Sequence, residues 1–323
     1  MKQTIQAQIK SPHAFSSEGT MFFKDIMIGQ HTLKEWFLAT RPWSFPASSM
    51  PVFVTMMFLW SQGYEVAWCL GLMALVNIIL VHAAGNVWSD YHDYKRGVDA
   101  ADTYGVRILT DKQFTPKEVL SLSVALQVAA VLMGLLMVYL TGITLLWFGL
   151  AGIALSLLYP PLKYVALGDL VIMACYALLP MLGTTFICTG YVVPEMLWLA
   201  VPLGSITVAI LHANNTRDIE TDGRAKIHTF AMLTGRKAAI RTYLFELILP
   251  YCWLLVVSLQ GIVSPWTLIT FITLPIALGN CKKMLSYKTE GLQAIAALDE
   301  ATAKLQLAFS LTLAIGLIVK ALT

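Results

Sequence analysis

The sequence has few charged residues, few cysteines and no region with the composition of a soluble domain. Only 13% of its 323 residues are charged, whereas 57% are hydrophobic, which is typical of an integral membrane protein. The five cysteines are scattered through apolar stretches without a CxxC pair, so we predict neither a zinc site nor a disulfide framework. We therefore expect a lipid bilayer around the chain and no nucleic-acid partner.

The N-terminus lacks the apolar core of a cleaved signal peptide. The first hydrophobic span itself is therefore expected to direct membrane insertion. Residues 1–30 are expected to form a tail. Residues 31–42 are expected to form a short interfacial helix, because Trp36 and Phe37 lie among polar neighbours there.

Long apolar runs are abundant. Taking about 20 apolar residues as the length that crosses the hydrocarbon core, we predict an all-α polytopic fold with nine transmembrane helices around a central cavity. The predicted spans are residues 43–62, 65–88, 119–140, 143–160, 168–190, 194–215, 238–260, 264–281 and 302–322. Helix breakers inside the spans, such as Pro51 and Pro202, fit such a cavity, because the backbone groups that they free need polar partners.

The basic residues are distributed asymmetrically. If the N-terminus is cytoplasmic, every Lys and Arg except Lys320 falls on the cytoplasmic side. Because cytoplasmic loops carry the excess of Lys and Arg, we predict a cytoplasmic N-terminus and a C-terminus on the opposite side. Long charged loops on the inner side predict a cytoplasmic cap.

We expect residues 1–42 to be a cytoplasmic tail with an interfacial helix, and residues 43–323 to be a single transmembrane domain. Acidic stretches follow the second and the sixth predicted span. Residues 43–167 and 168–281 are therefore predicted to form a pseudo-repeat, with the last helix, 302–322, appended.

The first acidic stretch, NVWSDYHDYKRGVDAAD, covers residues 86–102 and contains the carboxylates of Asp90, Asp93, Asp99 and Asp102. Asn86, Asp90 and Asp93 are spaced i, i+4, i+7, so a continuous helix would present them on one face. In the second stretch, NNTRDIETD, oxygen ligands recur every four residues, at Asn214, Asp218 and Asp222.

Carboxylates gathered near a low dielectric need cations or protons to neutralise them. Mg²⁺ prefers oxygen and is usually held by one or two carboxylates together with substrate phosphates. Interleaved basic residues would then contact the anion, namely Lys95, Arg96, Arg217 and Arg224. The alternative is that both stretches are solvated loops, but ionisable residues at the mouth of a helix bundle indicate function.

With these motifs the chain resembles the UbiA-type intramembrane prenyltransferases, and among them the 1,4-dihydroxy-2-naphthoate polyprenyltransferases of menaquinone biosynthesis. The resemblance covers nearly the whole chain from about residue 35. It rests on ATRPWSFPASSMP, GNVWSDYHDYKRGVDAAD, YPPLKYVALGD and HANNTRDIETDGRAKIHTFAMLTG. The first loop departs from the family pattern after its last Asp, where it reads TYGVRILTDKQF, which affects the contacts expected on the acceptor side.

The resemblance implies Mg²⁺-dependent transfer of a polyprenyl chain from polyprenyl diphosphate to an aromatic acceptor. The implied acceptor is 1,4-dihydroxy-2-naphthoate, which would lose its ring carboxyl and give demethylmenaquinone. The implied location is the bacterial inner membrane. Two Mg²⁺ ions would bridge the diphosphate to two ligand sets, Asn86, Asp90 and Asp93 in the first, and Asn215, Asp218 and Asp222 in the second, with Asn214 as a further possible ligand.

The residues support such chemistry independently of the family. Metal ions and basic side chains would neutralise the departing diphosphate, and aromatic faces would stabilise an allylic cation in a dry cavity. We expect catalytic roles for Asp90, Asp93, Asp218, Asp222, Arg217 and Lys95, and diphosphate contacts for Lys95, Arg96, Arg217 and Arg224. Candidates for acceptor contact or cation stabilisation are Arg41, Trp88, Tyr91, Tyr94 and Tyr159; Arg41 has the alternative of reaching the lipid headgroups.

Four further polar residues are compatible with a role in the cavity and with helix packing, namely His82, Asp169, His212 and Glu246. Two alternative functions also remain open. One is a family member that acts on another acceptor, such as 4-hydroxybenzoate, homogentisate or a glycerol phosphate lipid. The other is a cation transporter, although the acidic groups here cluster at one surface and transporter sites usually lie near the midplane.

Overall fold

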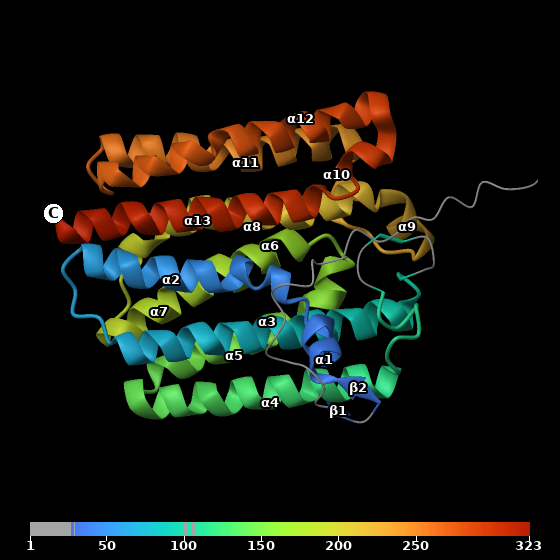
Figure 1. Ribbon diagram of the computed structural model, residues 1–323, viewed down its shortest axis with the longest axis horizontal. Helices are drawn as coiled ribbons and strands as arrows, with labels where there is room; N and C mark the ends of the chain where they lie inside the picture. The colour runs from blue at the N-terminus through green and yellow to red at the C-terminus, as the bar shows by residue number, and fades with distance from the viewer. Residues whose placement is uncertain (1–26, 29, 100–102, 105–106) are drawn as a thin grey trace, which may run out of the picture. The chain divides into compact units, whose positions relative to one another are not determined.

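The structure is a computed structural model that describes residues 27–28, 30–99, 103–104 and 107–323 (Figure 1). Most of the predicted tail, residues 1–30, therefore lies outside the described residues, as does Asp102. The chain divides into two compact units, Met1–Thr40 and Arg41–Thr323.

In the first unit, the described residues form a small hairpin followed by a short helix. Strands β1 (Met27–Ile28) and β2 (His31–Thr32) pair antiparallel, and α1 spans Leu33–Ala39. A capping box begins α1: the Thr32 hydroxyl accepts a hydrogen bond from the Glu35 amide, and the Thr32 amide donates to Glu35 Oε2 at 2.7 Å. The expected short helix is thus present, and its place at the membrane interface stays a prediction.

The second unit consists of long helices that run side by side (Figure 1). They are α2 (Pro46–Ser61), α3 (Trp68–Arg96), α4 (Pro116–Thr141), α5 (Thr144–Lys163), α6 (Gly168–Met173) continued by the π-helical η2 (Ala174–Leu178) and α7 (Leu179–Thr189), α8 (Leu197–Arg217), α11 (Arg236–Leu259), α12 (Leu274–Glu290) and α13 (Leu298–Leu322). Shorter elements are η1 (Pro42–Ser44), η3 (Pro194–Met196), α9 (Ile219–Arg224), α10 (Phe230–Thr234), η4 (Pro265–Thr273) and η5 (Gly291–Ile295). The predicted all-α polytopic fold is confirmed.

Within the described residues, eight helical segments are long and apolar enough to cross a membrane. They correspond to the second to ninth predicted spans. The first predicted span is shorter than expected, because η1 and Pro46 delay the start of α2 and the turn at Gln62 and Gly63 ends it after 16 residues. A helix of that length rises about 24 Å, less than the roughly 30 Å of the hydrocarbon core.

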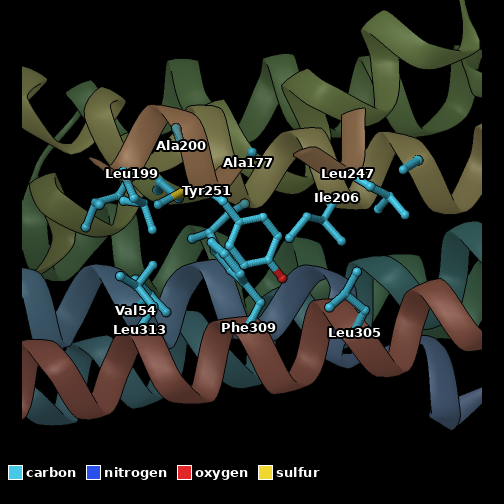
Figure 2. Packing of buried hydrophobic residues seen from close by; sticks show 14 of the residues in the cluster. Val54, Ala177, Leu199, Ala200, Ile206, Leu247, Tyr251, Leu305, Phe309 and Leu313 are labelled. Atoms are coloured by element: carbon cyan, nitrogen blue, oxygen red, sulfur yellow. The ribbon is translucent and has the colours of Figure 1, made fainter. Parts of the chain in front are cut away.

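The main apolar core lies where α2, α8, α11 and α13 meet (Figure 2). Tyr251 on α11 and Phe309 on α13 are buried in it with their ring centroids 5.5 Å apart, edge to face. The Tyr251 hydroxyl makes a 2.7 Å hydrogen bond with Thr273 Oγ1, which satisfies the buried phenol. Helix α13, expected as an appended helix, is therefore central, because it packs against α2 and α8.

The outer faces of α4 and α5 carry exposed apolar side chains, among them Leu132, Leu136, Tyr139 and Trp147. An exposed apolar surface of this kind is what a helix presents to lipid. These two helices therefore supply part of the lipid-facing wall, while α8 is mostly buried inside the bundle.

Candidate functional site

Three residues of the first acidic stretch, Asn86, Asp90 and Asp93, form the first motif and lie on the inward face of α3. This helix runs beyond the predicted span to Arg96 and ends at Gly97, whose φ of +69° is the left-handed conformation that favours glycine. Asp90 and Asp93 are buried, and Asn86 is half-buried on the same face. The predicted i, i+4, i+7 arrangement is therefore present.

Each of the two buried carboxylates has a cationic partner from another part of the chain. Arg41 forms an ion pair with Asp90 Oδ1, and Asp90 Oδ2 is buried without a hydrogen-bond partner in the described residues. Lys163 Nζ, at the end of α5, lies 3.3 Å from Asp93 Oδ2, and the Tyr164 hydroxyl donates to Asp93 Oδ1 at 2.6 Å. Burial and the Asp93 carboxylate both raise the pKa of the Tyr164 phenol, which keeps it a neutral donor.

A chain of hydrogen bonds orients the remaining residue of the first motif. Asn86 Nδ2 donates to Ser44 Oγ at 3.0 Å, and Ser44 Oγ lies 3.2 Å from His82 Nε2. Ser48 Oγ lies 2.8 Å from His82 Nδ1, so both ring nitrogens have a partner. His82 is therefore buried and connected to Asn86 through Ser44, and its role in positioning Asn86 stays a prediction.

The second motif spans the junction of α8 and α9. Helix α8 ends at Arg217, so the four-residue repeat is not carried by one continuous helix. The helical i, i+4 hydrogen bonds nevertheless continue through the junction. The Asp218 amide donates to the Asn214 backbone carbonyl at 2.9 Å, and the Asp222 amide donates to the Asp218 backbone carbonyl at 2.8 Å. Asn215 and Asp222 are buried, and Asn214 and Asp218 are half-buried.

Arg217 is held by several acceptors. Its guanidinium makes a bidentate contact with the Asp218 carboxylate, at 2.8 and 2.9 Å, and contacts Asn214 Oδ1. Its Nη1 also donates to Asp299 Oδ2 at 3.0 Å and to the Ala296 carbonyl at 3.1 Å. The side chain that we expected to bind diphosphate therefore joins the second motif to the start of α13 in this structure.

A small cap brings the two motifs to the same end of the bundle. Val98, five residues after Asp93, and Ile227, five residues after Asp222, are buried together with Tyr164. The Val98 amide donates to the Asp93 backbone carbonyl at 2.9 Å, and the Ile227 amide donates to the Asp222 backbone carbonyl at 3.3 Å. A parallel bridge between Val165 and His228 ties the loop after α5 to the loop after α9.

The electrostatics show that carboxylates of both motifs share one environment. Burial raises the pKa of Asp222 to about 7, the Lys163 ammonium opposes the shift, and the carboxylates of Asp218 and Asp93 add to it. Burial raises the pKa of Asp99 to about 6, and Asp93 adds to that shift. This cluster therefore carries more negative charge than its burial favours, which is the condition that a bound cation relieves.

The oxygen-rich ligand sets fit a hard divalent cation such as Mg²⁺. Both motifs offer carboxylate and amide oxygens and no sulfur, and Mg²⁺ takes such ligands. The unpartnered Oδ2 of Asp90 supplies a lone pair that folding has already removed from water.

Other predicted residues lie at the periphery. Lys95, Arg96, Tyr94 and Arg224 are exposed. Lys95 Nζ lies over the Tyr91 ring at 5.6 Å and lines a separate pocket of about 500 Å³ with Tyr91, Thr115 and Lys117. The Arg96 guanidinium carbon lies 4.8 Å from the centroid of the Tyr164 ring, and the rings of Trp88 and Tyr91 stack with their centroids 6.5 Å apart. Their expected roles stay predictions.

Sequence reasoning missed Lys163, Tyr164 and Asp299 as members of this site. The first two lie in the YPPLKY stretch, whose position directly after a span was the available signal. Tyr159, which was expected to be near the reaction, lies within electrostatic range of Lys163 and Asp93. For Asp299 no local signal existed, because its partner Arg217 lies 82 residues earlier.

Known proteins resemble this chain in sequence and in fold. The family model of the UbiA prenyltransferase family matches residues 48–315. The UbiA prenyltransferase domain-containing protein 1 of Danio rerio is 34% identical over 250 residues, which cover 75% of this chain and 73% of that protein.

Two solved structures share the fold. An apo UbiA homolog from Aeropyrum pernix K1 superimposes with a TM-score of 0.66 at 16% identity, covering 85% of this chain and 97% of the other. A UbiA homolog from Archaeoglobus fulgidus bound to GPP and Mg²⁺ gives a TM-score of 0.61 at 14% identity, covering 88% and 99%. This chain belongs to the UbiA prenyltransferase family and is a membrane-embedded prenyltransferase.

Proposed function

We propose that this enzyme transfers a polyprenyl chain from polyprenyl diphosphate to an aromatic acceptor in a Mg²⁺-dependent reaction. The observation that carries the proposal is the position of Lys163, which interacts electrostatically with Asp93 of the first motif and Asp222 of the second. Two acidic motifs that lie on either side of the Lys163 ammonium are suited to bind a diphosphate: the carboxylates bind its metal ions, and the ammonium contacts its oxygens. The Archaeoglobus fulgidus homolog bound to GPP and Mg²⁺ supports the same assignment.

The proposed ligand sets are Asn86, Asp90 and Asp93 for one Mg²⁺ ion, and Asn215, Asp218 and Asp222, with Asn214 as a further ligand, for a second. When bound, the ions would neutralise charge on the diphosphate oxygens and so make diphosphate a better leaving group. Among these ligands, Asp90, Asp93 and Asp218 are each paired with a basic side chain in the structure.

The basic residues of the site provide the protein's own contribution. Within the described residues, Arg41 and Lys163 each form an ion pair with one carboxylate, so they are placed to exchange that partner for the incoming diphosphate. As the bond between the allylic carbon and the diphosphate oxygen breaks, its electron pair leaves with the diphosphate. Lys163 stabilises this developing charge, and Tyr159, which interacts electrostatically with Lys163, is the candidate to stabilise the allylic cation.

We propose 1,4-dihydroxy-2-naphthoate as the acceptor, which would give demethylmenaquinol, the two-electron-reduced form of demethylmenaquinone. The electron pair of the acceptor ring forms the new carbon–carbon bond, and the ring then loses its carboxyl as CO₂. The support is the sequence resemblance, and other UbiA-type acceptors (4-hydroxybenzoate, homogentisate or a glycerol phosphate lipid) use the same metal chemistry. The relative named above is a fish protein, which gives no support to a bacterial inner membrane. That location, the cytoplasmic N-terminus and the pseudo-repeat stay predictions.

Prenyl transfer by the purified enzyme in lipid nanodiscs tests this proposal. The enzyme would receive a polyprenyl diphosphate, Mg²⁺ and a panel of aromatic acids, with the product identified by mass. Asp90→Asn and Asp218→Asn should each lower diphosphate release at least about 100-fold, because loss of one group that stabilises developing charge costs about 2.7 kcal/mol or more. The matched control is Asp111→Asn, an exposed aspartate paired with Arg107, which should retain activity.

Activity of both motif variants within about twofold of wild type would contradict the assignment of the site. Product formation from another acceptor but not from the naphthoate would contradict the acceptor alone. The two outcomes are separable, because metal-dependent release of diphosphate reports on the site for any acceptor.

A further inference from the structure

A second polar cluster lies inside the bundle and is not used by the proposed transfer reaction. It joins three helices: Asp169 at the start of α6, His212 near the end of α8 and Glu246 in the middle of α11. His212 is 1% exposed and Glu246 is 8% exposed, so both are buried among membrane helices. Burying ionisable groups in such positions costs free energy, so these groups indicate a function.

The cluster is not satisfied by its own hydrogen bonds. His212 Nδ1 faces two carboxylates at once, lying 3.5 Å from Asp169 Oδ2 and 3.3 Å from Glu246 Oε1. Within the described part of the chain, both His212 nitrogens, Asp169 Oδ1 and Glu246 Oε2 are buried and lack a hydrogen-bond partner. A protonated imidazole would instead draw one carboxylate to about 2.7–2.9 Å, the length of a charge-assisted hydrogen bond.

The two distances from His212 Nδ1 to the carboxylates match the edges of a metal coordination polyhedron. Zn²⁺ binds histidine nitrogen and carboxylate oxygen at about 2.0–2.2 Å in tetrahedral geometry, which places neighbouring ligand atoms about 3.3–3.6 Å apart. The two nitrogen-to-oxygen separations, 3.3 and 3.5 Å, fall in this range, and all three ligand atoms lie within 4.8 Å of one another. An octahedral Mg²⁺ with bonds of about 2.0–2.1 Å would bring neighbouring ligands closer, to about 3.0 Å.

Charge balance supports the same conclusion. Two carboxylates and one imidazolium leave a net negative charge in a low dielectric, whereas two carboxylates, a neutral imidazole and a divalent ion are neutral together. A mixed set of one histidine and two carboxylates also favours a transition metal over the all-oxygen sites of Mg²⁺ and Ca²⁺.

We propose that Asp169, His212 and Glu246 form a binding site for one divalent transition-metal ion, with Zn²⁺ as the best match, separate from the Mg²⁺ sites of the acidic motifs. The bound ion joins α6, α8 and α11. It thereby fixes the end of α8, where Asn214 and Asn215 lie two and three residues after His212. These three residues position the second motif and have no contact with substrate in this role.

Metal analysis of the purified protein tests the proposal without any activity measurement. The protein in detergent would be equilibrated with Zn²⁺ in the presence of excess Mg²⁺, desalted, and analysed by mass spectrometry for bound metal. We expect about one Zn²⁺ per chain for the wild type and less than about a tenth of that for His212→Gln. His228→Gln, a histidine with an exposed side chain, is the matched control and should bind as the wild type does.

Two further measurements keep the proposal falsifiable if His212→Gln does not fold. Zn²⁺ should raise the Tm of the wild type and leave that of Asp169→Asn and Glu246→Gln unchanged, because a ligand stabilises only the state that binds it. Co²⁺ in place of Zn²⁺ should give the visible absorption of a tetrahedral site. Wild-type protein that retains no metal and shows no shift in Tm would overturn the proposal.

The metal site and the transfer reaction fail independently in these experiments. Asp90→Asn should lose transfer and still bind one Zn²⁺, because its carboxylate is absent from the cluster. Loss of Zn²⁺ from Asp90→Asn to the same extent as from His212→Gln would show that the bound metal belongs to the acidic motifs, and the proposal would be wrong.

Discussion

Two lysines test how the diphosphate is bound. Lys163 lies 3.3 Å from Asp93 with only 13% of its side chain exposed, whereas Lys95 is exposed and lies over the Tyr91 ring. The sequence predicted a catalytic role for Lys95, and the structure places Lys163 between the two motifs. Replacing each lysine with methionine removes the ammonium and keeps most of the side-chain volume.

The expected magnitudes follow from burial. At an effective dielectric of about 20, unit charges at the distance of Lys163 from Asp93 interact by roughly 5 kcal/mol. Loss of one preorganised donor to developing charge usually costs about 2.7–4 kcal/mol, or about 100- to 1,000-fold in rate. We therefore expect Lys163→Met to lower kcat/KM by that factor. Lys95→Met should change it less than about fivefold, because exposed charges contribute about 1 kcal/mol or less.

The assay is Mg²⁺-dependent diphosphate release in nanodiscs with a saturating acceptor and a varied prenyl diphosphate concentration. Lys163→Arg, which keeps the positive charge, is the control and should retain more activity than Lys163→Met. Thermal unfolding of each variant separates lost catalysis from lost folding, since an uncompensated buried carboxylate is itself destabilising. The reasoning is refuted if folded Lys163→Met stays within fivefold of wild type, or if Lys95→Met is the more damaging change.

Two further predictions concern one hydrogen bond and one close helix contact. Tyr164→Phe removes a 2.6 Å hydrogen bond to Asp93, so kcat/KM should fall roughly 10- to 100-fold in the same assay, because hydrogen bonds to charged groups contribute about 1.5–3 kcal/mol. An unchanged value would show that this hydrogen bond has no part in the reaction. Gly316→Ala should lower the free energy of unfolding by about 1–3 kcal/mol, because the new Cβ would lie 2.3 Å from the Trp266 carbonyl oxygen. The control is Gly279→Ala, whose Cβ would meet nothing within 4 Å, so this variant should be neutral or stabilising. Equal Tm values of the two variants in detergent would contradict this prediction.

The sequence was sufficient for the parts of the fold that depend on local pattern. Long apolar runs identified the membrane helices, and the i, i+4, i+7 spacing of Asn86, Asp90 and Asp93 placed these residues on one face of α3. Both signals lie within a few turns of one helix. The shortness of α2 was missed, because hydropathy does not register where a proline and a glycine turn begin and end the helix.

The partners of the acidic residues were not predictable in the same way. Asp90 pairs with Arg41, 49 residues earlier, and Asp93 contacts Lys163 and Tyr164, at least 70 residues later. Such contacts depend on how the helices pack, which a single sequence does not specify. Lys95 was favoured because it is interleaved with the acidic residues of the chain; it lies two residues from Asp93, and residues two apart on a helix point in different directions, so its role stays a prediction.

The last helix shows why the site depends on the whole second unit. Asp299, at the start of α13, accepts from Arg217, which also holds both carboxylate oxygens of Asp218. Near its other end, α13 approaches the Trp266 backbone so closely that only Gly316 fits. Because α13 is fixed at both ends, its contact with Arg217 fixes the position of the second motif. Lys163 of α5 interacts electrostatically with both Asp222 of that motif and Asp93 of the first. The first motif is therefore not balanced in charge by its own residues, because the basic partners of Asp90 and Asp93, Arg41 and Lys163, come from other parts of the chain.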